Sequence, residues 1–301
     1  MASAELKSRP EQPIFWNHLV SWIRSIPRSA VLSMVGPSLL CVFGYFGWLY
    51  YGAHNLDMAY YGLKKENIYL TDQPAWLRKT NVLDEVFTGG SLSRLSLMDV
   101  KTTEMLVRVF GAHPAIRKTH RVEKMAGGVA ITVEYRIPIA MVHVNTAHDD
   151  NSGKGKAGYL PVDQEGVLLD EANFTPADVP QYIIIHAAGD PATTISLAGK
   201  SFGDPRIEEA AGLCGLLAPL KEKCKISQVI VYQTLKPGKA RWELEIVTTD
   251  TGPRFKWGSG PGVEPNLGEP TTEAKLTQFL AMIQDSKQWT TATIDLSGSK
   301  R

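Results

Sequence analysis

The stretch HPAIRKTHRVEKMAGGVAITVEYRIPIAMV, residues 113–142, decides the fold of this 301-residue chain. Two strand-like runs, residues 116–123 and 129–137, flank the pair Gly127 and Gly128. Because glycine adopts the positive φ angles that tight turns need, the stretch predicts a β-hairpin. It holds no catalytic triad, metal cluster or phosphate loop, so the hairpin is expected to serve the architecture rather than a reaction.

The segments before this hairpin extend it into a small α+β domain. Residues 67–70 form a short apolar run that predicts a strand. Residues 76–87 and 99–110 repeat apolar side chains at helical spacing. Together with the hairpin they give the order β-α-α-β-β, which we assign to residues 64–142.

Residues 143–301 predict a second, distal domain of mixed α/β type with an extended sheet. Amphipathic spacing predicts helices over residues 205–221 and 272–284; the apolar face of the second helix carries Leu276, Phe279, Leu280 and Ile283. Alternating or apolar runs predict strands at residues 141–144, 159–162, 166–170, 181–186, 226–235, 241–248, 253–257 and 289–296.

Residues 29–52 form an apolar run without a charged side chain. About 24 residues at about 1.5 Å each would span roughly 36 Å, enough for a hydrocarbon layer of about 30 Å. The run is too long for the apolar core of a signal peptide and ends in bulky aromatic residues, which favours an uncleaved anchor over a cleaved leader or a buried core helix. The sequence therefore predicts a single N-terminal transmembrane helix at residues 29–52.

Positive charge is densest before this run, within residues 1–28. The positive-inside rule then predicts that residues 1–28 are a cytoplasmic tail and that the bulk of the chain lies outside the cytoplasmic membrane. Cys214 and Cys224 would lie outside as well, either as a disulfide or as two buried free thiols.

Composition and motifs argue against an enzyme or a nucleic-acid binder. The formal net charge is +1, without the basic face typical of nucleic-acid recognition. The fragment AGKSFG at residues 198–203 has Thr194 where a phosphate loop needs glycine. His143, His148 and the acids at residues 149–150 do not follow a metal-ligand spacing, so they predict a solvated loop. No catalytic residue, cofactor, metal or small-molecule substrate is expected.

Three motifs carry a family resemblance. They are His113-Pro114-Ala115-Ile116 before the hairpin, Tyr135-Arg136-Ile137-Pro138-Ile139-Ala140 after it, and the run from Tyr159 to Val167. With an N-terminal anchor and the β-α-α-β-β order, the chain resembles the FtsQ/DivIB family of bacterial cell-division proteins, whose first extracytoplasmic module is a POTRA domain. Tyr135 stands where the family has glutamate, and Pro161 is an extra residue in the third motif.

The resemblance implies a non-catalytic scaffold in the inner membrane at the division site, with its bulk in the periplasm or extracytoplasmic space. It also implies partners of the FtsB and FtsL type, bound by the distal domain. The physical route would be strand addition to an open sheet edge, and residues 289–297, WTTATIDLS, alternate suitably and lack proline. The predicted partner-binding residues are Trp289, Thr291, Thr293 and Asp295.

Three alternatives remain at this stage. The closing strand could be an interior strand whose threonines merely face solvent. The chain could be another POTRA-bearing envelope protein, acting in outer-membrane assembly or secretion. It could also be an anchored enzyme whose site follows no recognisable motif.

Overall fold

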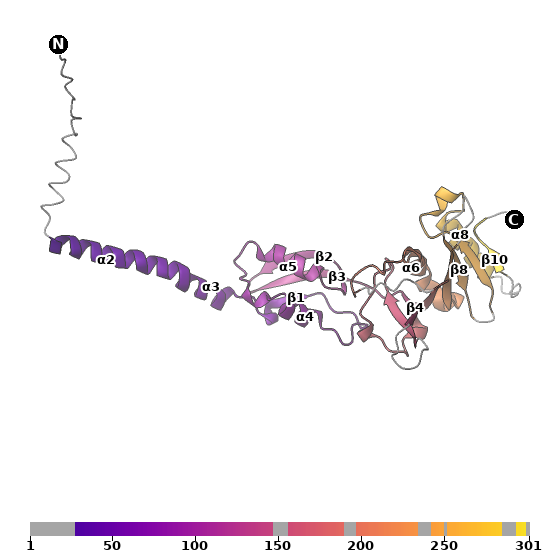
Figure 1. Ribbon diagram of the computed structural model, residues 1–301, viewed down its shortest axis with the longest axis horizontal. Coiled ribbons are helices and arrows are strands. Elements are labelled where there is room, and N and C mark those ends of the chain that lie inside the picture. The colour runs from indigo at the N-terminus through magenta and orange to yellow at the C-terminus, as the bar shows by residue number, and fades with distance from the viewer. Residues whose placement is uncertain are drawn as a thin grey trace, which may run out of the picture. The chain divides into compact units, whose positions relative to one another are not determined.

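The computed structural model describes most of the chain in two units, residues 1–62 and residues 63–301. The described residues are 28–146, 156–189, 197–233, 242–249, 252–284 and 293–298. The second unit holds a three-stranded and a seven-stranded sheet (Figure 1). Each sheet has its own hydrophobic core. The protein is thus an α+β structure.

The described part of the first unit is helical, in three consecutive pieces. Helix α2 (Arg28–Gly47) passes into a π-helical segment (Trp48–Gly52) and then into α3 (Ala53–Tyr61). Among the described residues, no helix combines the length and the apolar character that crossing a membrane requires.

The prediction of a transmembrane helix over residues 29–52 is therefore wrong. Its physical basis was one continuous apolar α-helix, whereas the α-helical pattern ends at Gly47 and gives way to a π-helix. Inside α2, Pro37 and several serine and glycine residues dilute the apolar side chains. The predicted tail, residues 1–28, lies outside the described residues apart from Arg28, which begins α2.

The smaller sheet contains the hairpin that was predicted within residues 113–142. Its strands are β1 (Ile68–Leu70), β2 (Ile116–Met125) and β3 (Gly128–Tyr135), in the order β1-β3-β2. Strand β1 runs parallel to β3, and β2 runs antiparallel to it. Gly127 makes the turn at φ +82°, a left-handed conformation that favours glycine.

Two helices cover one face of the smaller sheet, α4 (Val82–Gly89) and α5 (Thr102–Gly111). Their buried side chains join those of β1 and β3 in one core. Helix α4 begins later than the predicted residues 76–87, because the Asn81 side chain accepts a hydrogen bond from the Asp84 amide and caps the helix there.

The larger sheet has the order β10-β9-β8-β7-β6-β4-β5. Its strands are β4 (Ala140–Thr146), β5 (Lys156–Val162), β6 (Ile183–Ala187), β7 (Gln228–Gln233), β8 (Trp242–Val247), β9 (Arg254–Gly258) and β10 (Thr293–Asp295). Strands β4, β6 and β7 run parallel, as do β9 and β10, and the remaining pairs are antiparallel. Since β4 begins at Ala140, residues 140–142 belong to this sheet and not to the smaller one.

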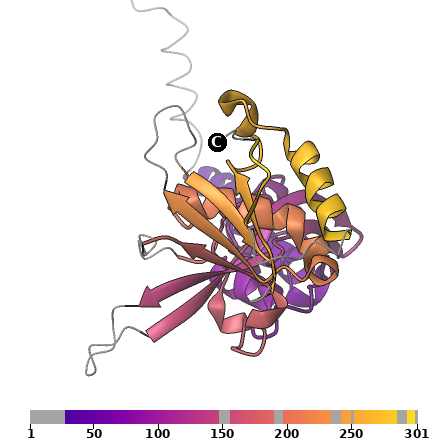
Figure 2. The ribbon, with the colours of Figure 1, turned by 90° about the vertical axis from the view of Figure 1, so that its right-hand side faces the viewer.

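Helices α6 (Pro205–Leu217) and α8 (Thr272–Gln284) pack on one face of the larger sheet, and Figure 2 shows the strands fanning out beside them. The side chains between these layers form a core of apolar residues, with Phe279 in edge-to-face contact with Phe255. The residues that alternate with these core residues, such as Met141, Ile184, Glu245 and Lys256, lie on the opposite face.

Polar contacts join the loop after β1 to the segment that leads into β6. The Arg78 guanidinium donates two hydrogen bonds of 3.0 Å to the Asp178 carboxylate. The Asn173 side-chain carbonyl accepts from the amides of Lys79 (2.9 Å) and Thr80 (3.2 Å). Bidentate charge-assisted bonds of this kind fix orientation as well as distance, so these contacts set the two cores against each other.

A second group of ion pairs joins the hairpin to the turn after β5. Arg136 pairs with the buried carboxylate of Asp163, and it also contacts Glu165 at 3.2 Å. Arg117 donates to Glu165 at 2.6 Å and to Glu134 at 2.7 Å. Glu134, the residue before Tyr135, thus accepts the Arg117 contact on the hairpin side.

The contact at Asp178 predicts a pH-dependent loss of stability. The Thr175 hydroxyl, followed by the Arg78 guanidinium, lowers the pKa of Asp178 to about 2. An unfolded aspartate titrates near about 3.9, so the stabilisation is present above that pH and is lost as the pH falls towards 2. Asp178→Asn should lower the urea midpoint at pH 7, and its difference from wild type should shrink between pH 4 and pH 2.

The matched control is Glu104→Gln, at an exposed i,i+4 pair with Arg108. Exposed pairs of this type contribute little, so this variant should differ little from wild type at either pH. A difference between Asp178→Asn and wild type that stays constant from pH 7 to pH 2 would contradict the assigned role of the carboxylate.

Candidate functional site: the β10 edge

The predicted partner-binding strand lies at one end of the larger sheet. Thr293 and Asp295 begin and end β10, whereas Trp289 and Thr291 lie outside the described residues. Strand β10 pairs in parallel with β9, with Thr293 opposite Arg254 and Asp295 opposite Lys256. Within the described part of the chain, no strand pairs with the other side of β10.

One backbone hydrogen bond fixes which groups of β10 face outward. The Leu296 amide donates to the Lys256 carbonyl at 2.9 Å, so Leu296 faces β9. In a parallel pair, alternate residues of one strand bond the same neighbour, which places Ile294 towards β9 as well. The N–H and C=O groups of Thr293 and Asp295 therefore point to the open edge.

Burial on the two faces of β10 agrees with this register. Ile294 packs against the core of the larger sheet, and Leu296 is fully buried. The side chains of Thr293 and Asp295 are exposed on the opposite face. Three residues of strand are thus anchored by apolar side chains while their edge stays open, which is the arrangement that strand addition needs.

The Asp295 side chain is used within the chain. Its Oδ1 accepts hydrogen bonds from the Ser297 amide (2.8 Å) and the Ser297 hydroxyl (2.6 Å). This turn ends the strand, in the way aspartate commonly binds the backbone two residues later. Asp295 would consequently meet a partner strand through its backbone, and Thr293 offers both its backbone and its hydroxyl.

The charges next to the edge are balanced. On β9, Arg254 pairs with Glu245 at 3.2 Å, and Lys256 pairs with Glu243 at 3.0 Å. Both acids belong to β8, and each pair joins diagonal neighbours, because Lys256 lies directly opposite Glu245 and Arg254 opposite Val247. Because the charges satisfy one another, recognition at this edge would depend mainly on backbone hydrogen bonds.

A buried ion pair between Lys275 and Glu269 stabilises the region next to this edge. Lys275 on α8 is completely buried, and its Nζ lies 2.7 Å from Oε2 of Glu269 and 5.5 Å from the centre of the Trp257 ring. The same Oε2 accepts from the Ser259 amide at 3.0 Å and the Ser259 hydroxyl at 2.8 Å. The carboxylate therefore ties the loop that follows β9 to helix α8.

The start of this loop also packs closely against Ser297, which follows β10. Gly258 has φ +89°, and a side chain there would collide with Glu269 and with Ser297. Lysine is rarely buried unless it is paired, so its presence in this helix gives no direct indication of the ion pair. The available signal was the four-residue spacing from Lys275 to Phe279, which puts both on one helix face.

The other candidate groups do not assemble a reactive site. Cys214 and Cys224 are buried free thiols, so of the two alternatives the unpaired one holds, and burial raises the pKa of the Cys214 thiol. In the described ranges no three potential metal ligands of the His, Cys, Asp or Glu type lie together. His143 lies on β4, and residues 148–150 are outside the described residues.

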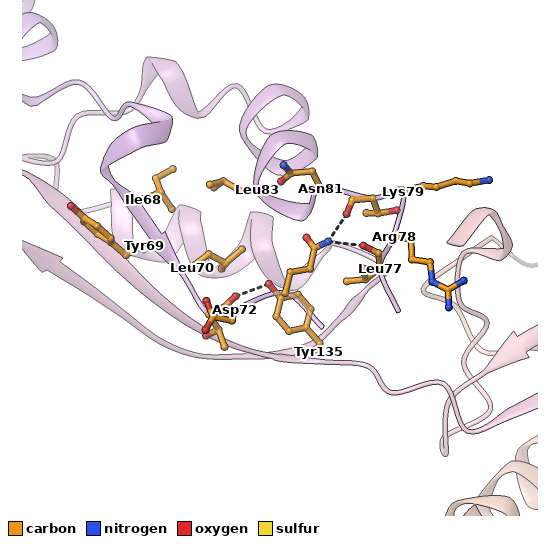
Figure 3. A pocket seen from close by; sticks show the side chains of 13 residues that line it. Ile68, Tyr69, Leu70, Asp72, Leu77, Arg78, Lys79, Asn81, Leu83 and Tyr135 are labelled. Atoms are coloured by element: carbon orange, nitrogen blue, oxygen red, sulfur yellow. Dashed lines mark hydrogen bonds between the residues drawn. The ribbon is translucent and has the colours of Figure 1, made fainter. Parts of the chain in front are cut away.

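A cavity of about 680 Å³ lies beside β1 and the loop that follows it. Figure 3 shows Tyr135, Leu70 and Leu77 around it, while the charged ends of Arg78 and Lys79 point away. The Gln73 amide donates to the carbonyls of Leu77 and Thr80. These hydrogen bonds hold the loop of residues 73–80 that lines the cavity. Its lining contains one carboxylate, Asp72, and no histidine or cysteine.

In comparisons with known proteins, no protein-family model matches the chain, and no curated protein matches it at a significant level.

Proposed function

We propose that this chain is a non-catalytic scaffold of the bacterial division machinery that binds partner proteins by strand addition to β10. The observation that carries the proposal is the open edge at Thr293 and Asp295, whose outward backbone groups have no strand partner among the described residues. Such groups bind an extended segment of another chain without requiring a particular side chain.

The motif resemblance to the FtsQ/DivIB family supports the division context and the type of partner. On this proposal the partners are of the FtsB and FtsL type, and the protein works at the division site of the cell envelope. The smaller sheet and its helices would serve recruitment, as the POTRA domain does in that family. The balanced charge of +1 gives no support to a nucleic-acid partner.

The test is the position of an N-terminal fluorescent fusion in dividing cells. We expect a band at the constriction that appears before the daughter cells separate. The control is the same fusion carrying Thr293→Pro, which should reach the site less well if partner binding retains the protein there. A uniform envelope signal through the whole cycle would contradict the division role, and the assembly and enzyme alternatives would then take its place.

A further inference from the structure

Two histidines lie side by side on the face of the larger sheet that α6 and α8 leave uncovered. His143 belongs to β4 and His186 to β6, two parallel neighbours in which Val142 is paired with Ile185. His143 and His186, the next residue on each strand, therefore lie side by side. The centres of the two imidazole rings are 4.8 Å apart, and the ring planes are tilted by 35°.

Both rings are half-buried and held by their surroundings. Val142 and Ile185, the neighbours of the two histidines in the chain, are fully buried on the opposite face and fix the strands. Tyr159 on β5 stands opposite His143 and contacts it edge-on, with ring centres 5.4 Å apart. Among the described residues, no hydrogen bond or ion pair engages the ring nitrogens of either histidine.

The separation of the rings matches two imidazoles bound to one metal ion. A metal–nitrogen bond of about 2.0–2.1 Å and roughly 1.1 Å from nitrogen to ring centre put each centre about 3.2 Å from the metal. Two ligands at an angle of roughly 90–110° then have centres about 4.5–5.2 Å apart. The observed 4.8 Å lies inside this interval.

We propose that His143 and His186 form a two-histidine site for a single divalent transition-metal ion of the Cu²⁺ or Zn²⁺ class, with water in the remaining positions. Imidazole nitrogen is a preferred ligand of these ions. The neutral imidazole ring is the form that binds metal.

This site is independent of the proposed scaffold function. Three strands, β7, β8 and β9, separate β6 from β10 in the sheet. Loss of metal binding would therefore leave the edge at β10 intact, and loss of partner binding would leave the histidines intact. Each proposal can therefore be disproved without affecting the other.

The experiment is a titration of the full chain with Cu²⁺, the divalent ion that nitrogen ligands bind most tightly in the first transition row. Isothermal calorimetry gives the affinity, and pulsed electron paramagnetic resonance counts the imidazole nitrogens on the copper. His143→Phe and His186→Phe keep an aromatic ring in place and remove only the ligating nitrogens. His120→Gln is the matched control, because His120 is an exposed histidine on β2 paired with Glu134.

We expect wild type to bind one Cu²⁺ more tightly than any other, through two imidazoles. Each phenylalanine variant should lower that affinity at least about tenfold and leave at most one imidazole on the ion, whereas His120→Gln should not change it. Equal Cu²⁺ affinity in wild type and His186→Phe would overturn the proposal. So would a spectrum of wild type with a single imidazole, a result that does not depend on the folding of any variant.

Discussion

Thr293→Pro is expected to weaken partner binding by about ten- to a hundredfold while the chain stays folded. The Thr293 N–H points to the open edge, so the substitution removes a donor that a partner strand would use and no bond within the sheet. The proline ring also occupies the space beside the edge. A lost hydrogen bond and this obstruction together correspond to roughly 1.5–3 kcal/mol. Surface plasmon resonance with an immobilised protein of the proposed partner type measures the change.

Two neighbouring variants test the register behind this prediction. Thr293→Ala keeps the backbone donor and should bind within about threefold of wild type, because it removes only an exposed hydroxyl. Ile294→Pro removes an N–H that faces β9, so it should release β10 from the sheet and destabilise the domain. If Thr293→Pro binds as well as Thr293→Ala, β10 does not bind its partner by strand addition.

The second large effect is expected at Lys275. Lys275→Met leaves the Glu269 carboxylate, which is only 16% exposed, without its cation. Removing one partner of a buried ion pair typically costs about 3–5 kcal/mol, because an uncompensated charge stays buried. Urea unfolding followed by tryptophan fluorescence measures this loss, and hydrogen exchange should show it at β9 and β10 more than at β2 and β3.

A charge-neutral partner substitution separates electrostatics from packing. The double variant Lys275→Met with Glu269→Gln removes both charges and keeps the volume of each side chain, so it should recover most of the lost stability. Lys118→Met, at an exposed position of β2, is the control and should change stability by less than about 0.5 kcal/mol. A double variant as unstable as Lys275→Met alone would mean that the ammonium group acts by filling space.

Periodicity predicted the elements whose signal is local. The helix expected at residues 272–284 is present as α8 (Thr272–Gln284), and the hairpin around Gly127 forms between β2 and β3. Both depend on spacing within one segment, 3.6 residues in the helix and two in the strands. The same spacing was misleading at residues 76–87, where a capping side chain delays the helix to Val82.

Strand pairing could not be predicted in the same way, because it joins segments that are far apart in the chain. The sequence predicted strands at residues 159–162 and 166–170, but it did not show that β5 pairs with β4 along its length. A short hairpin of these residues is present as well: Val162 bridges Leu168, and the Leu169 amide donates to the Pro161 carbonyl at 2.9 Å. Apolar alternation shows that a strand has a buried face, and it does not identify the neighbour.

The same limit applies to both sites. Thr293 and Asp295 were found from an alternating run, but the direction of their backbone groups required the pairing of β10 with β9. His143 and His186 are 43 residues apart in the sequence, and only the parallel register of β4 and β6 brings their rings together. Lys275 was missed because the burial of its charge depends on Glu269, six residues earlier in an irregular loop.

The connection from β9 through α8 to β10 has a consequence for how the chain folds. Strand β10 is short, and its partner β9 is separated from it in the chain by residues 259–292, which include α8. Closing such a loop costs chain entropy before any contact rewards it, so this pairing should be among the slow steps. A nascent or partly folded chain would therefore expose β9 instead, and a partner that recognises β10 would distinguish finished molecules from unfinished ones.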